Sequence, residues 1–232
     1  MSVTLTAADP VRIRPLVFAA GVSALLFFAP VVTQGEEPTQ LIIGNFSGGE
    51  LASWEEKKFS GQTIYQITEL DGQRVLSAQA QNSASGLFKK TQIDLLDTPY
   101  LNWSWRIDNH LAPLDEKSKA GDDYSVRLYV VIDGGLYFWR TRSLTYVWSS
   151  QPEQDKIWVN AYAGRNAMML AVRAQGDNTK TWYWEKRDVF KDLKTIFGEE
   201  IRYIDAVALM TDTDDSNGQA SSYYGDIYFT AE

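Results

Sequence analysis

Alternation of apolar and polar side chains, repeated over many short segments, constrains the fold of this chain more than any other feature of its sequence. Residues 101–108 and 123–132 alternate cleanly, and an Asp-Gly pair at 71–72 lies between two further alternating segments. Such alternation is typical of β-strands, and Asp-Gly is a strong signal for a two-residue hairpin turn. We predict strands at residues 41–46, 63–69, 74–80, 87–95, 101–108, 123–132, 143–148, 168–173, 181–187, 204–211 and 223–230.

One segment, residues 188–197, instead places its apolar side chains at helical spacing. Asp188 is its candidate N-cap and Gly198 its stop signal. Many short strands with one helix favour a two-layer β-protein over other classes. We therefore predict an all-β fold, a single antiparallel β-sandwich of jelly-roll type over residues 41–232, which residues 36–40 precede as a linker.

The N-terminus has the features of an export signal. Arg12 and Arg14 precede an almost wholly apolar stretch, residues 16–32, and polar sequence follows at once. This order is typical of a secretory signal peptide, so residues 1–35 are predicted to be cleaved off. The alternative is an uncleaved membrane anchor, because about 17 apolar residues approach the lower limit for spanning a bilayer. The expected location is periplasmic or secreted, without membrane insertion after cleavage.

Composition excludes several kinds of chemistry. The 232 residues include no cysteine and one histidine, His110. Disulfides, thiol nucleophiles, cysteine-ligated metals and multi-histidine metal sites are therefore excluded within one chain, and an exported domain must fold on its core alone. The formal net charge of −8 argues against nucleic acid as a partner. The one cofactor that we consider is a structural calcium ion.

Alternation also predicts which aromatic side chains are buried. Trp103 and Trp105 share an apolar face of one strand and are expected in the core, as is Tyr124 on the strand at 123–132. Trp182 and Trp184 also share a face, and we predict that they are core too. The alternative for both tryptophan pairs is an exposed platform for sugar rings.

The opposite faces of these strands carry charges and hydroxyls. If the strands are neighbours, one sheet face presents a predicted ligand-binding cluster of Arg106, Arg127, Tyr129, Arg173 and Glu185. Arginines in mid-strand are costly unless they are paired or face water. Their guanidinium groups can hold carboxylates, sulfates or sugar hydroxyls above an aromatic ring. The simpler alternative is a set of cross-strand ion pairs on a solvated face.

No spacing of carboxylates singles out a catalytic pair. Asp122 and Asp123 precede a strand, where adjacent side chains point to opposite faces, whereas two-carboxylate catalysis needs both groups on one substrate. If the protein is an enzyme, the candidates are Asp122, Asp123 and Glu185. We commit to no catalytic residue and lean toward a protein without enzymatic activity.

Residues 211–218 place oxygen-bearing side chains at alternate positions, as calcium loops do. Counted from Asp212, the sixth position is Asn217 and the twelfth is Tyr223. An EF-hand requires glycine and glutamate at these positions, so this is not an EF-hand. Asp212 and Asp214 stay as weak candidates for calcium ligands, beside the alternative of a polar turn.

Several longer segments are similar to one bacterial family. They are residues 103–109, 119–124, 126–130, 146–148, 185–189, 208–214 and 223–227. Over roughly residues 41–230 the chain resembles the family known as domain of unknown function 3047. This resemblance implies an exported β-sandwich similar to carbohydrate-binding modules, of galactose-binding-like type, without an established activity. It also implies that Asp226, near the last strand, would hold a calcium ion beside the first strand, near residues 45–46.

The function we predict is non-catalytic binding of a saccharide, or of another polar or anionic ligand, on a concave sheet face. One alternative is a polysaccharide hydrolase or lyase that uses Asp, Glu or Tyr chemistry. The other is a structural envelope protein whose arginines merely pair with carboxylates. The oligomeric state is not predicted.

Overall fold

The computed structural model describes residue 1, residues 40–136 and residues 140–232. The predicted signal peptide, apart from Met1, and all but the last residue of the predicted linker lie outside the described residues. Both therefore stay predictions. Within the described residues, no helix is long and apolar enough to span a bilayer.

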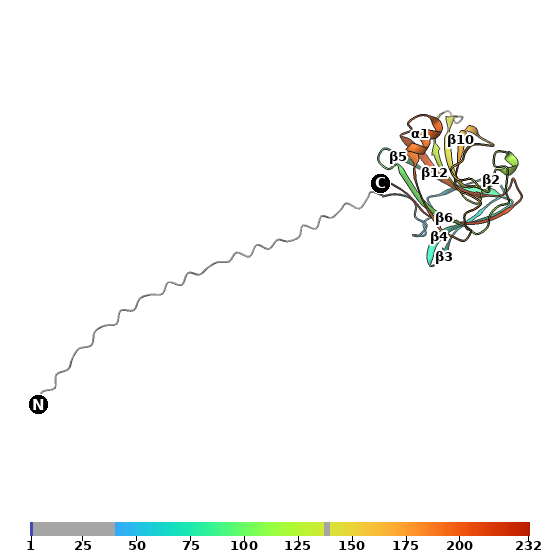
Figure 1. Ribbon diagram of the computed structural model, residues 1–232. Helices are drawn as coiled ribbons and strands as arrows, with labels where there is room; N and C mark the ends of the chain where they lie inside the picture. Colours follow the sequence, from blue (N-terminus) through green and yellow to red (C-terminus); the bar gives the residue numbers. More distant parts are fainter. Residues whose placement is uncertain (2–39, 137–139) are drawn as a thin grey trace. The chain divides into compact units, whose positions relative to one another are not determined.

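Two β-sheets make up the described fold (Figure 1). The six-stranded sheet contains β1 (Gln40–Gly44), β3 (Ile64–Leu70), β4 (Gln73–Gln81), β6 (Tyr100–Ile107), β11 (Tyr183–Asp188) and β13 (Gln219–Thr230). The seven-stranded sheet contains β2 (Glu55–Ser60), β5 (Ala84–Asp94), β7 (Arg127–Ile132), β8 (Arg142–Trp148), β9 (Ile157–Asn160), β10 (Gly164–Arg173) and β12 (Tyr203–Asp212). In Figure 1, β3, β4 and β6 lie together, apart from β5, β10 and β12.

The strand order is β11-β6-β13-β4-β3 in the six-stranded sheet, where β1 also pairs with β13, and β2-β5-β12-β7-β8-β10-β9 in the seven-stranded sheet. Among the described strands, the pairs are antiparallel except β8 with β10, which run parallel. The predicted all-β sandwich with one short helix is confirmed, and the parallel pair is a departure from it.

Two local predictions are confirmed at the residues that carry them. The turn between β3 and β4 places Asp71 and Gly72 at φ 54° and 78°, as a two-residue hairpin turn with left-handed backbone requires. The helix α1 (Val189–Phe197) begins after Asp188, whose carboxylate accepts the backbone N–H of Lys191, and ends at Gly198 in the left-handed conformation.

The hydrophobic core lies between the two sheets, and Trp103 and Trp105 are buried in it as predicted. The rings of Trp103 and Tyr146 are 5.3 Å apart, and those of Trp105 and Trp148 are 6.4 Å apart. Since β6 and β8 belong to different sheets, these ring contacts join the layers. Burial of large rings is the main source of stability for a domain that has no disulfide.

Tyr124 is buried, but outside the main core. Strand β7 begins at Arg127, so the predicted alternation does not extend back to Tyr124. Its ring packs in a second cluster with Val147, Trp158, Met169 and Ala171. Val147 lies between two core residues of β8 and therefore faces outward. Part of the outer face of the seven-stranded sheet is thus covered, which explains how charged groups become buried there.

Candidate functional site

The predicted cluster of arginines does not form on one face. Arg106 lies on β6 of the six-stranded sheet, whereas Arg127 and Tyr129 lie on β7 of the seven-stranded sheet. Arg173 ends β10 and Glu185 lies on β11, again in different sheets. The prediction assumed neighbouring strands, and this assumption is wrong because consecutive strands of a sandwich often cross from one sheet to the other.

Each of the three arginines pairs with carboxylates instead. Arg106 contacts Asp71 and Asp108 at 2.8 and 3.0 Å. Arg173 binds Glu185 through Nε at 2.6 Å, so these two predicted residues do meet. Burial works against the charge of Arg173, but its hydrogen bonds and charge interactions with Glu185 and Asp177 together outweigh burial and raise the pKa of Arg173. These pairs match the alternative in which the charges stabilise one another.

Arg127 has the most buried of these ion pairs. Its Nε donates to Asp212 at 2.8 Å, its Nη1 lies 3.3 Å from Asp122, and its Nη2 donates to the backbone oxygen of Asp122. The guanidinium carbon is 4.6 Å from the centre of the Tyr124 ring. Each of its donors is directed at a protein group, so Arg127 holds the segment before β7 onto the sheet.

The candidate catalytic aspartates are structural in this arrangement. Asp122 accepts from Arg127 and Asn160, whereas Asp123 accepts the backbone N–H groups of Asp215 and Ser216. The two carboxylates therefore serve different partners, as expected for adjacent residues. Neither lies in a cleft with Glu185.

The predicted calcium ligands do not converge. Asp212 is paired with Arg127, and Asp226 accepts the backbone N–H and the hydroxyl of Ser47 at 2.8 and 2.5 Å. Asp226 does lie beside the first strand, where the resemblance placed it, but hydrogen-bond donors occupy its carboxylate. Among the described residues, Asp214 groups with Asp123 and Asp215 instead.

Three carboxylates with raised pKa values, Glu116, Asp122 and Asp214, give the fold a predicted pH dependence. Burial raises the pKa of Asp122, although the charge of Arg127 and a hydrogen bond from Asn160 act against it. Burial raises the pKa of Glu116, although Ser149 and Ser150 donate to it. Burial, and then the charge of Asp215, raise the pKa of Asp214. Because the folded state binds protons more tightly at these groups than the unfolded chain, the free energy of unfolding should rise as the pH falls from 7 to about 5.

Two carboxylates that pair with cations, half-buried Asp94 and exposed Glu200, set the pH below which this trend reverses. Hydrogen bonds from Arg202 and Lys194 lower the pKa values of Asp94 and Glu200, respectively. These two groups add to the free energy of unfolding at pH values above the ordinary carboxyl pKa, and this contribution is lost below about pH 4. Urea unfolding over a pH series measures the curve, and Glu116→Gln should flatten its rise. A steady fall of stability from pH 7 to pH 5 would contradict the assignment.

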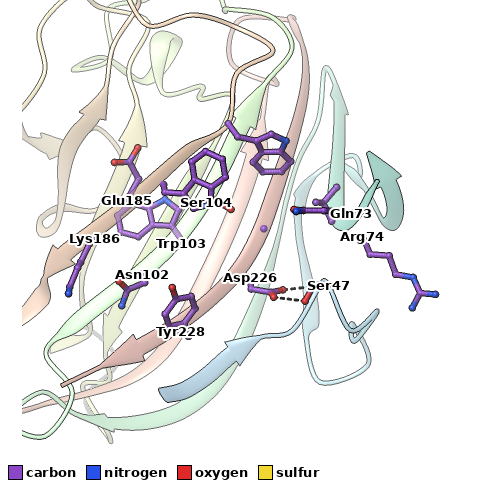
Figure 2. A pocket seen from close by; sticks show the side chains of 14 residues that line it. Ser47, Gln73, Arg74, Asn102, Trp103, Ser104, Glu185, Lys186, Asp226 and Tyr228 are labelled. Atoms are coloured by element: carbon purple, nitrogen blue, oxygen red, sulfur yellow. Dashed lines mark hydrogen bonds between the residues drawn. The ribbon is translucent and has the colours of Figure 1, made fainter. Parts of the chain in front are cut away.

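An open cleft lies on the outer face of the six-stranded sheet (Figure 2). We call it the tryptophan cleft, and its volume is about 310 Å³. The lining residues on which the argument depends are Ser104, Trp182, Trp184, Gly225, Asp226 and Tyr228. Figure 2 shows Asp226 bonded to Ser47 at the side of the cleft where Tyr228 also lies.

The register of three neighbouring strands builds this cleft. Trp184 of β11 pairs with Ser104 of β6. On the other side of β6, a bulge between Tyr224 and Ile227 sets Gly225 and Asp226 opposite Ser104. A side chain at Gly225 would collide with the Ser104 hydroxyl. The floor is therefore shallow, between the Trp184 indole on one side and Asp226 on the other.

The chemistry of the cleft is aromatic and polar. Trp184 is 74% exposed, and Trp182 and Tyr228 are half-buried. Within the described residues, the Ser104 hydroxyl makes no hydrogen bond and Lys186 forms no ion pair. The two carboxylates of the lining, Asp226 and Glu185, are bonded to Ser47 and Arg173. The Lys186 ammonium lies 4.7 Å from the centre of the Tyr100 ring. The cleft thus offers the Ser104 hydroxyl, this ammonium and an indole face rather than a free acid and base.

The prediction that Trp184 is core is wrong, and the reason lies in the strand's place. β11 is an edge strand of its sheet, and Trp184 and Lys186 share its outward face, with Trp182 just before the strand. Tyr183 packs inward against Trp148, with ring centres 5.3 Å apart. The sequence does contain a signal for this exposure. Lys186 is two positions after Trp184 and therefore lies on the same face of the strand, and a lysine side chain is rarely buried.

A comparison with protein families shows to which family this chain belongs. The model of a family described as "Protein of unknown function (DUF3047)" matches residues 52–228. The chain belongs to the DUF3047 family. This membership confirms the resemblance found in the sequence. No curated protein matches the DUF3047 chain.

Solved structures similar to the DUF3047 chain are distant in sequence. Endoglucanase Cel12A from Rhodothermus marinus is 10% identical at a TM-score of 0.49, over 82% of this chain and 99% of that one. The family 30 carbohydrate-binding module of a cellulosomal cellulase from Clostridium thermocellum is 12% identical at 0.48, over 84% and 98%. A carbohydrate-binding module structure of the β-sandwich superfamily is 12% identical at 0.46, over 81% of this chain and 61% of that chain.

Proposed function

We propose that this DUF3047 domain binds a saccharide in the tryptophan cleft without catalysing a reaction on it. The observation that carries the proposal is the 74% exposed indole of Trp184 beside a free hydroxyl on the cleft floor. An indole offers a flat apolar face to the C–H groups of a sugar ring, and neighbouring polar groups bind its hydroxyls. Ser104 and Lys186 are placed to do so.

The hydrogen-bonding state of the carboxylates supports binding over catalysis. Glu185 accepts from Arg173 and from the Trp105 indole, and Asp226 from Ser47. A hydrolase needs two carboxyl groups that face one substrate, and these two have other partners. The rival proposal of a hydrolase or lyase is tested by incubating the protein with envelope polysaccharides and measuring new reducing ends or unsaturated products.

The proposal includes export of the protein to the periplasm or the cell exterior. It rests on the basic and apolar pattern of residues 1–35. N-terminal sequencing of protein from the producing cells tests it, since a start near residue 36 is expected after cleavage. An intact N-terminus in the membrane fraction would support the anchor alternative instead.

Replacing Trp184 by alanine should weaken binding of the best neutral oligosaccharide on a glycan array by about tenfold or more. The reason is loss of the stacking surface from a side chain that contributes little to the core. Titration calorimetry with that oligosaccharide measures the affinity. Tyr203→Ala is the matched control, because Tyr203 is also an exposed aromatic but lies on the other sheet. Equal affinities of both variants and the parent would refute the site.

A further inference from the structure

A second and larger cleft lies on the outer face of the seven-stranded sheet, opposite the sheet that bears the tryptophan cleft. Its volume is about 650 Å³. We call it the alanine groove, and the residues used below are Gly86, Phe88, Tyr129, Ala206 and Ala208. Leu87, Leu128, Val207 and Leu209, which alternate with them, are buried in the core. The groove residues therefore face away from the core.

Strand register defines the floor and walls of the alanine groove. Ala208 of β12 pairs with Phe88 on one side and with Tyr129 on the other. One step along, Ala206 pairs with Lys90 and with Val131. The two alanines thus form a low floor between strands that lie roughly 10 Å apart. Phe88 and Tyr129 stand as walls on either side.

The rim of the groove carries lysines without carboxylate partners. Lys57 lies 5.1 Å from the centre of the Phe59 ring, and Lys90 lies 6.0 Å from that of Phe88. Among the described residues, neither forms an ion pair. The third cation of the lining, Arg142, is paired with Glu199.

The two acidic residues of the lining, Asp133 and Asp205, lie at the Ala206 end of the groove and accept hydrogen bonds from the protein. Asp205 accepts the backbone N–H of Asp133 at 2.9 Å and the Gln92 amide. Asp133 accepts the backbone N–H of Gly135. The hydrogen-bonding capacity of these carboxylates is thus partly used by the protein, whereas Lys57 and Lys90 keep free N–H donors for an anionic ligand.

The apolar floor of the groove determines which kind of ligand can lie on it. The alanine, glycine and phenylalanine side chains of the groove cannot satisfy sugar hydroxyls, and the Tyr129 hydroxyl already donates to the Met210 sulfur. Burying a hydroxyl without a partner is costly. A hydrocarbon chain has no such groups and gains from leaving water. The alanine groove therefore differs from the tryptophan cleft, whose floor holds a free hydroxyl.

We propose that the alanine groove binds a long-chain carboxylate. Its hydrocarbon chain lies on Ala206 and Ala208 between Phe88 and Tyr129. The charges of Lys57, at the Gly86 end of the floor, and Lys90, at the Ala206 end, attract its carboxylate. This function is separate from saccharide binding, because the two clefts lie on different sheets and share no residue.

The test uses laurate and the neutral glycerol monolaurate, which has the same chain, in titration calorimetry with the full domain. The double variant Lys57→Gln and Lys90→Gln should weaken laurate binding by about tenfold and change monolaurate binding less than about twofold. The matched control is Lys117→Gln with Lys191→Gln, which removes the same charge elsewhere. Ala208→Trp, which fills the floor, should abolish binding of both ligands.

Several results would overturn the proposal. One is no binding of laurate to the parent protein, and another is equal loss in the two lysine double variants. A third is lysine-dependent binding of an acidic oligosaccharide in place of laurate, which would assign the groove to glycans. Trp184→Ala should leave laurate binding unchanged, so failure of the saccharide proposal and failure of this one are distinguishable. The exposed lysine variants keep the test valid if Ala208→Trp does not fold.

Discussion

Replacing Arg127 by methionine should lower the free energy of unfolding by about 3–5 kcal/mol. The side chains of Arg127, Asp122 and Asp212 are only 5%, 6% and 2% exposed. Removing the cation leaves two buried carboxylates without their counter-charge, and water cannot reach them to compensate. The expected loss of unfolding free energy is therefore larger than the modest net contribution of the ion pairs to stability. Urea unfolding followed by tryptophan fluorescence measures it.

Arg202→Met is the matched control for this prediction. Arg202 also binds an aspartate, Asp94, through Nε and Nη2, but it lies at the surface. Water solvates Asp94 when the partner is lost, so the stability should change little. Equal losses in the two variants would show that burial does not set the cost. Saccharide binding should survive in folded Arg127→Met protein, because Arg127 lines neither cleft.

Replacing Trp105 by alanine should cost about 3–5 kcal/mol of unfolding free energy. Trp105 is fully buried, and its ring lies 5.3 Å from that of Trp103 in edge-to-face geometry. Its Nε1 also donates to Glu185 at 3.0 Å. Truncation would create a cavity between the sheets and remove a hydrogen bond from the carboxylate that holds Arg173. Thermal and urea unfolding should both report the loss.

Trp184→Ala provides the contrast on the neighbouring strand. Since most of this indole is in solvent, stability should change by less than about 0.5 kcal/mol, while saccharide affinity falls. The two variants thus distinguish Trp105, which stabilises the fold, from Trp184, which binds the saccharide. A large loss of stability in Trp184→Ala, or a small one in Trp105→Ala, would contradict the assignment of faces.

Short-range patterns in the sequence predicted most of the architecture. The Asp-Gly hairpin, the capped helix and the buried face of β6 depend on neighbouring residues in the chain, so local spacing was sufficient. The predicted burial of Tyr124 is confirmed, but its ring packs in the second cluster because β7 begins only at Arg127. Local spacing failed at Trp184, because alternation divides the side chains of a strand between two faces without saying which face is covered.

The candidate sites depended on contacts that no local pattern contains. Ser104 and Trp184 are 80 positions apart in the chain but are register partners. Arg106 and Arg127 look equivalent in the sequence, yet one is on each sheet. In the sequence the arginines resemble ligand-binding groups, because carboxylate partners such as Asp212 for Arg127 lie far away along the chain.

Alternation by itself determined that this chain forms a two-layer β-fold with large aromatic rings between the layers, since one face of each strand must leave water. Only the tertiary structure decided which strands are neighbours, and therefore which arginines are neutralised and which tryptophan is exposed. The physical reason is that burial of apolar faces is satisfied by many strand orders. The pairing order alone places a free hydroxyl beside an indole on one sheet and two alanines between aromatic walls on the other.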